Sequence, residues 1–274
     1  MSDLRTALLR GRNRPRNTGA GSPTTLRGDG YEFVELREYV AGDDPRRIDW
    51  ASTARTGALQ TRIVLEDVAL TLAAILDESP SMQVGRRRSL AAAGNEALDV
   101  WYDAASADDR CARITGDGLV APLGLRGRRS ALVCMDSARG TGPASFDFVG
   151  ALEVAYAALP RGTAVLAIGD FFDVGIEQDR LLAQLGMRFD CTALVARDPW
   201  ADDLPLRGFV RMRDVETGSA RRLFVGKRER CAYARAVCDR ELRLRERLAA
   251  RNWRVGALTE DNPAHALYEA FALR

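Results

Sequence analysis

The stretch VALTLAAILDESPS, residues 68–81, decides the fold class of this sequence. Its first part, 68–76, is apolar except for Thr71, which is typical of a strand buried on both faces of a sheet. The residues that follow are two acids, two serines and a proline, which end the strand in a polar turn. Because sites in open parallel sheets form at the carboxyl ends of strands, this turn is the first place to look for function.

Similar apolar runs recur along the chain and alternate with helical patterns. Strands are expected at 109–116, 163–169, 188–196 and 253–258. Helices are expected at 87–105, 128–138, 148–159, 176–186, 228–251 and from Pro263 onward. Such alternation is typical of parallel strands joined by helices. The sequence therefore predicts an α/β fold with a Rossmann-like, mostly parallel sheet flanked by helices.

Three regions differ in composition. Residues 1–28 combine Arg, Gly, Pro and Asn, which predicts a flexible basic arm. Residues 29–66 contain two stretches that alternate apolar with polar residues around a run of turn formers, which predicts a small β segment. Residues 67–274 are predicted to form the α/β domain, with a hairpin insertion near 208–226.

Composition excludes several classes of protein. The 274 residues carry 40 Lys plus Arg and 38 Asp plus Glu, a formal charge of +2, so nucleic acid is not an expected partner. The only lysine, Lys227, is followed by Arg228 where a P-loop ATPase needs Ser or Thr, so that class is excluded. The only histidine is His265, nine residues from the end, which leaves most nucleophile and base triads without a base. No apolar run reaches the ~20 residues of a membrane span. Five scattered cysteines and a start without a secretory signal predict a cytoplasmic location.

The turn after the first buried strand carries oxygen ligands. Asp77, Ser79 and Ser81 lie at i, i+2 and i+4, so one carboxylate and two hydroxyls can converge on a common point. The strand at 163–169 likewise runs into Asp170. Such oxygen groups suit Mg²⁺ or Mn²⁺. The competing interpretation is that Asp77 and Ser79 only form a turn or cap the next helix.

Longer motifs resemble a known family. The segments GDGYEFVELREYVAGDDPRRIDWASTARTGALQTRIVLED and ALTLAAILDESPSM occur in the order and spacing of the bacterial family called domain of unknown function 58. The similarity continues through IGDFFD at 168–173, the hairpin at 213–218 and LTEDNPAHALYEAF at 258–271, so it spans roughly residues 28–272.

The resemblance implies a von Willebrand factor A-like domain with a metal-ion-dependent adhesion site. Asp77, Ser79 and Ser81 match its first motif, and Asp170 matches a later aspartate. The third motif departs, because Phe146 stands where relatives often have threonine. Ser145, or Thr141, is then the candidate replacement ligand. Family members are associated with MoxR-type AAA+ ATPases, and chaperone-like assembly is their usual proposed role.

The family-signature loop is dense in charge. We expect it to tie the β segment to the α/β domain through Arg–carboxylate bonds, with Trp50 and Ile48 as apolar anchors. A partner-contact surface is the alternative. Its residues are Gly42, Asp43, Asp44, Arg46, Arg47, Asp49 and Trp50.

Three functions are compatible with these residues. The first is a non-enzymatic interaction module in which an ATPase or client protein donates a carboxylate to a bound Mg²⁺ or Mn²⁺. The second is a nuclease-like hydrolase that uses Asp77, Asp170, Asp173 and Asp147 around metal ions. The third is a structural scaffold whose metal site is degenerate.

Overall fold

The computed structural model describes residues 2–12, 32–40, 43, 45–65, 69–137, 146–201, 204–215 and 218–272. The chain divides into two compact units. The first, here the sheet unit, comprises Met1–Asn17 and Leu70–Arg274. The second, here the small unit, comprises Thr18–Ala69.

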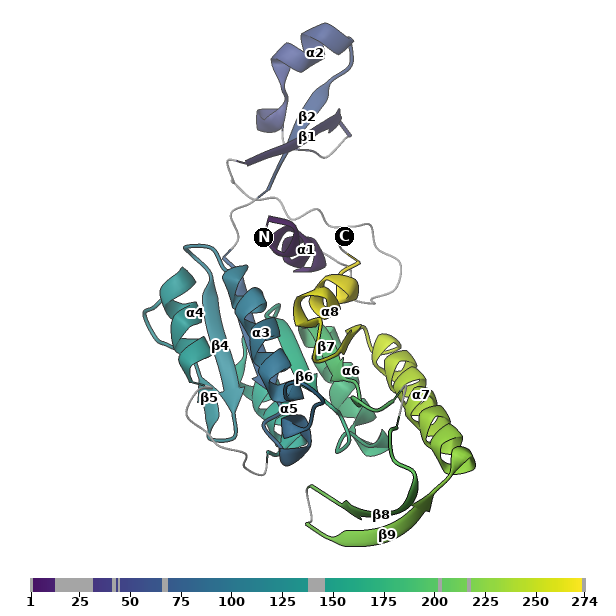
Figure 1. Cartoon of the computed structure of the whole chain (residues 1–274). Coiled ribbons are helices and arrows are strands. Elements are labelled where there is room, and N and C mark those ends of the chain that lie inside the picture. The colour runs from purple at the N-terminus through teal and green to yellow at the C-terminus, as the bar shows by residue number, and fades with distance from the viewer. Residues whose placement is uncertain are drawn as a thin grey trace. The chain divides into compact units, whose positions relative to one another are not determined.

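A six-stranded sheet with the order β10-β7-β6-β3-β4-β5 forms the centre of the sheet unit (Figure 1). Its strands are β3 (Thr71–Leu76), β4 (Arg110–Thr115), β5 (Gly118–Val120), β6 (Ala164–Gly169), β7 (Asp190–Ala196) and β10 (Arg254–Leu258). Every neighbouring pair is parallel except β4 with β5. The predicted mostly parallel sheet is confirmed.

Helices cover both faces of this sheet and create two apolar cores (Figure 1). One core contains residues of α1 (Ser2–Arg12), α3 (Leu90–Asp103), α4 (Gly127–Asp136) and α8 (Pro263–Ala270). The other contains residues of α5 (Phe148–Ala158), α6 (Asp179–Arg188) and α7 (Lys227–Ala249). Along β3, Leu72 faces the first core and Ala73 the second. This two-sided burial explains why the strand has no polar alternation.

The predicted flexible arm over residues 1–28 is wrong at its beginning. Ser2–Arg12 forms helix α1, and Leu4 and Leu8 are buried in the first core. The two leucines are four residues apart and so lie on one face of the helix. Arg5 pairs with the buried Asp109 and fixes the helix further. The basic composition of the segment concealed this short apolar stripe. Residues 13–28 lie outside the described residues.

The small unit contains the predicted β segment and a helix that the sequence did not reveal. Strand β1 (Glu32–Glu38) pairs antiparallel with β2 (Gln60–Leu65), and a 3-10 turn lies at Pro45–Arg47. Helix α2 (Trp50–Thr56) follows, with the side chain of Asp49 accepting from the backbone N–H of Ser52 and Gly57 ending it at φ 74°. Helix caps of both kinds are short signals that a run of turn formers obscures.

A third sheet is a two-stranded hairpin inserted between β7 and α7. Its strands are β8 (Gly208–Arg213) and β9 (Ala220–Val225), which pair antiparallel without a bulge (Figure 1). The hairpin insertion predicted near 208–226 is thus present.

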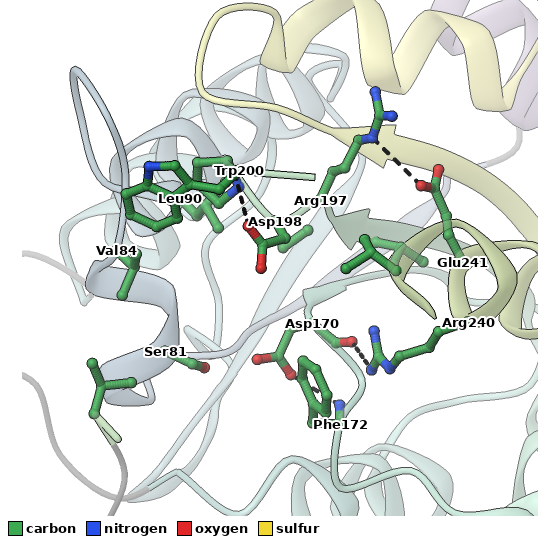
Figure 2. A pocket seen from close by; sticks show the side chains of 15 residues that line it. Ser81, Val84, Leu90, Asp170, Phe172, Arg197, Asp198, Trp200, Arg240 and Glu241 are labelled. Carbon is green, nitrogen blue, oxygen red and sulfur yellow. Dashed lines mark hydrogen bonds and ion pairs between the residues drawn. The ribbon is translucent and has the colours of Figure 1, made fainter. Parts of the chain in front are cut away.

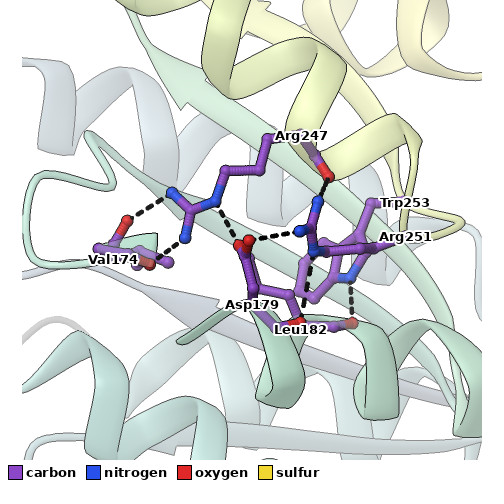
Figure 3. A network of polar contacts seen from close by, with 7 residues as sticks. Val174, Asp179, Leu182, Arg247, Arg251 and Trp253 are labelled. Carbon is purple, nitrogen blue, oxygen red and sulfur yellow. Dashed lines mark hydrogen bonds and ion pairs between the residues drawn. The ribbon is translucent and has the colours of Figure 1, made fainter. Parts of the chain in front are cut away.

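A polar network ties α7 to the start of α6 (Figure 3). Arg247 donates to the carboxylate of Asp179, to the carbonyl of Val174 at 2.8 Å and to that of Gly175. Arg251 donates to the second carboxylate oxygen of Asp179. One acid at a helix N-terminus therefore accepts from two guanidinium groups, and the arrangement also fixes the loop that contains a 3-10 turn at Ile176–Gln178.

Removal of that acid should destabilise the sheet unit. We expect Asp179→Ala to lower the free energy of unfolding by about 1–3 kcal/mol, because two partly buried guanidinium groups lose their shared acceptor. Urea denaturation measures this. The matched control is Glu269→Ala, which breaks an exposed pair with His265 and should change stability by less than about 0.5 kcal/mol. Equal effects of the two substitutions would contradict the role given to the network.

Candidate metal centre

Two central strands bring two acids to one edge of the sheet. β3 and β6 pair in parallel register, with Leu76 beside Ile168, and the N–H of Asp77 donates to the carbonyl of Ile168 at 2.8 Å. Asp170 follows the end of β6. The intervening Gly169 leaves room for the acid, because a Cβ there would lie 2.9 Å from the Cβ of Asp77. The ends of the strands thus meet as the sequence predicted.

Asp77 and the two serines form a compact turn. Asp77 is 4% exposed, and its Oδ1 accepts from the N–H of Ser79 at 2.9 Å. The Oγ atoms of Ser79 and Ser81 lie 2.9 Å apart. Pro80 begins a 3-10 turn over Pro80–Gln83, which limits the freedom of the loop. One carboxylate and two hydroxyls therefore lie on the same short loop, although the turn interpretation also accounts for the bond to Ser79.

The surroundings of Asp77 disfavour its ionised form. Burial raises the pKa of this carboxyl from its ordinary value to about 6, against the hydrogen bonds from Ser79, which lower it. The negative charges of Asp170 and Asp173 raise this pKa further. A cation bound among these oxygens would favour the ionised form and relieve the repulsion.

Asp170 is held by its own loop and by α7 (Figure 2). Its Oδ1 accepts from the N–H of Phe172 at 2.9 Å, and its carbonyl accepts from Arg240 at 2.7 Å. The guanidinium of Arg240 lies 3.6 Å from the ring centroid of Phe172. Burial lowers the pKa of Arg240, and the charge of Asp170 opposes that shift. Because Arg240 bonds the backbone carbonyl, it occupies neither carboxylate oxygen of Asp170.

A cavity of about 230 Å³ opens beside the serine loop (Figure 2). Ser81 and Asp170 line one side of it, and Leu90, Trp200 and Arg240 are among the other lining residues. The candidate site therefore borders a partly apolar hollow rather than a flat surface.

The third ligand position differs from the family pattern. Phe146 is buried in the second core, where its ring lies 6.3 Å from that of Phe148. The side chain of Asp147 accepts from the N–H of Gly150 at 2.8 Å and so caps α5. Ser145 and Thr141 lie outside the described residues. The hydroxyl at the third position therefore stays a prediction, and Asp147 acts as a helix cap.

Glu260 fixes the loop next to the site, and sequence reasoning missed it. Its Oε2 accepts from the N–H groups of Arg86 and Arg87 at 2.7 and 3.1 Å, and these bonds hold its pKa below the usual range. Arg88 donates to its carbonyl. Two backbone N–H groups and one arginine side chain of residues 86–88 therefore donate to Glu260. Because Glu260 follows β10, the strand-end rule applied to that strand could have found it.

A buried arginine lies close to the same rim. Arg113 of β4 is 1% exposed, and its Nη2 donates to Glu78 at 3.2 Å. Among the described residues its Nε and Nη1 atoms have no hydrogen-bond partner. Glu78 therefore offsets a buried positive charge and is oriented toward β4.

The described residues of the family-signature loop make contacts within the small unit. Asp43 pairs with Arg37 at 2.7 Å, and Asp49 pairs with Arg62 at 2.7 Å while capping α2. Trp50 is 68% exposed. Gly42, Asp44 and the side chain of Arg47 lie outside the described residues, and Arg46 is described as exposed. These ion pairs brace the loop against its own β segment.

Two kinds of feature are absent from the described ranges. No group of three or more His, Cys, Asp or Glu side chains in them is arranged as a metal site. None of the helices in the described part of the chain has the length and apolar character to span a membrane.

Comparisons with known proteins find a family and distant structures. The family model described as "Protein of unknown function DUF58" matches residues 35–243. Uncharacterized proteins of Mycobacterium bovis and Mycobacterium tuberculosis are each 32% identical over 220 residues, covering 77% of this chain and 68% of theirs.

Among solved structures, the conserved hypothetical protein BatB of Bacteroides thetaiotaomicron is 13% identical with a TM-score of 0.46, covering 74% of this chain and 98% of that one. An aerotolerance-related membrane protein of Bacteroides fragilis is 13% identical with a TM-score of 0.45, covering 74% and 96%.

The raised pKa of Asp77 predicts a pH-dependent stability. The folded protein holds this proton up to about pH 6, whereas the unfolded chain releases it near its ordinary value. Stability should therefore fall as pH rises from about 4 to about 6 and stay lower above that. Asp77→Asn has no proton to release, so its stability should not fall in this pH range. In EDTA at pH 7 we therefore expect the variant to be more stable than the wild type by about 2–3 kcal/mol.

Urea unfolding from pH 4 to pH 7 measures the difference. The control is Asp147→Asn, since asparagine also caps helices and Asp147 is exposed, and its profile should follow the wild type. Parallel profiles for Asp77→Asn and wild type would refute the assignment.

Proposed function

This chain belongs to the DUF58 family, and we propose that it is a non-enzymatic protein-interaction module with a metal-ion-dependent adhesion-type site. The observation that carries the proposal is the buried Asp77 beside the paired hydroxyls of Ser79 and Ser81, at the rim that also holds Asp170. In this proposal the chain works by binding a protein partner through a cation.

The donor set fits a hard divalent cation. Asp77, Ser79 and Ser81 would hold Mg²⁺ or Mn²⁺ directly, Asp170 directly or through water, and Ser145 is the candidate fifth group. The electrostatic strain among Asp77, Asp170 and Asp173 supports this fit, because it is the kind of repulsion that a cation offsets. The bound ion would supply a coordination position for the partner's carboxylate.

The fold and the partner are proposed on the same basis. A parallel sheet whose central strands β3 and β6 end at the candidate site supports a von Willebrand factor A-like arrangement. Membership of the family supports a MoxR-type AAA+ ATPase, or its client, as the carboxylate donor. The module would then act in cytoplasmic protein assembly or maturation.

Titration calorimetry tests the metal site. We expect the full chain to bind Mg²⁺ and Mn²⁺, and Asp77→Asn to weaken binding at least about tenfold, because a direct carboxylate ligand is lost. Asp147→Asn should bind like the wild type. If the wild type binds neither Mg²⁺ nor Mn²⁺, the metal site is refuted and the structural scaffold is the function that stands. Hydrolysis of a phosphodiester with Mn²⁺ that Asp77→Asn abolishes would establish the nuclease-like hydrolase instead.

Partner binding gives a separate prediction. The chain should co-precipitate a MoxR-type ATPase from the same organism in Mg²⁺, and either EDTA or Asp77→Ala should reduce the recovered ATPase at least about tenfold. Circular dichroism of the variant controls for folding. Undiminished recovery in EDTA would contradict a bridging cation.

A further inference from the structure

The β8–β9 hairpin exposes a mixed basic and aromatic face. Phe209 pairs across the strands with Phe224, and Arg211 pairs with Arg222. Because side chains alternate along a strand, these four residues and Arg213 lie on one face. The two rings pack edge to face with centroids 5.2 Å apart, yet Phe209 is 86% and Phe224 57% exposed.

The opposite face of the hairpin is also exposed. Val210 pairs with Leu223 and Met212 with Arg221, and Met212 and Leu223 are 41% and 46% exposed. An isolated two-stranded hairpin is marginally stable in water. Both faces of this one therefore carry apolar area that lacks a covering element in the described part of the chain.

Positive charge is concentrated in the same segment. Residues 207–230 hold eight Arg or Lys against three Asp or Glu, a formal excess of five, whereas the whole chain has +2. Arg211 and Arg222 lie directly opposite each other, which destabilises a strand pair. Neither forms an ion pair with any acid that the structure describes. An acidic partner would remove this repulsion.

We propose that the β8–β9 hairpin is a docking surface for an extended acidic protein segment in which carboxylates alternate with aliphatic side chains. Alternate residues of an extended peptide repeat at about 6.6–6.8 Å, which is the spacing of Arg211 and Arg213 along β8. Carboxylates on one side of the segment would meet the arginines, and its aliphatic side chains would cover the exposed apolar residues.

An acidic protein segment fits this surface better than nucleic acid does. Nucleic acid could stack on Phe209 and Phe224, but it would leave the apolar residues of the opposite face uncovered. The two strand edges are unpaired within the described residues, so a peptide can also add backbone hydrogen bonds. This docking surface is independent of the candidate metal centre.

Fluorescence anisotropy with the full chain tests the proposal. The probe is a labelled octapeptide of alternating Glu and Val, and the comparison peptide has Lys in place of Glu. We expect the acidic peptide alone to bind, and the double variant R211E/R222E to weaken binding at least about tenfold. This variant keeps like charges opposite each other, so the strand pair is perturbed little.

The matched control is R128E/R129E, which changes the same number of exposed charges on α4 and should leave binding unchanged. Neither EDTA nor Asp77→Asn should alter binding, which separates this inference from the proposed function. Failure of the peptide to bind would overturn the proposal. So would tighter binding of a short oligothymidylate, or of phosphatidylcholine–phosphatidylserine vesicles, lost in R211E/R222E, because either result would identify a different class of partner.

Discussion

The parallel pairing of β3 with β6 is the contact on which the rest of the structure depends. Both strands lie inside the sheet and are buried on both faces, so helices on either side must cover them. The same pairing places Asp77 against Gly169 and brings Asp170 to the same edge. The position of the candidate site therefore follows from the register of two strands rather than from any single loop.

The sequence predicted the parts of the fold that have strong periodicity. The apolar runs at 68–76 and 163–169 and the long charged helix at 228–251 correspond to β3, β6 and α7. Prediction from the sequence failed where a helix depends on only a few residues. Helix α1 depends on Leu4 and Leu8 in an arginine-rich stretch, and α2 depends on one cap at Asp49. Such short signals are weak beside turn formers and charge.

The candidate site was predictable in part for the same reason. Asp77 and Asp170 follow buried strands, so their convergence could be inferred from the chain alone. The bonds from the Arg86 and Arg87 backbones to Glu260 join residues more than 170 positions apart, and no local pattern encodes them. The capping role of Asp147, by contrast, does have a local signal, because an aspartate directly before the predicted helix at 148–159 is an N-cap pattern.

The packing of helix α1 constrains the order in which the sheet unit can fold. Leu4 and Leu8 belong to a core that also contains Ala266 and Leu267 of α8, and the whole small unit lies between them in the chain. During synthesis α1 leaves the ribosome long before the surface that buries it exists. Helix α1 can therefore complete its packing only after α8 has been synthesised. An expression fragment that starts at the family motif would lack α1.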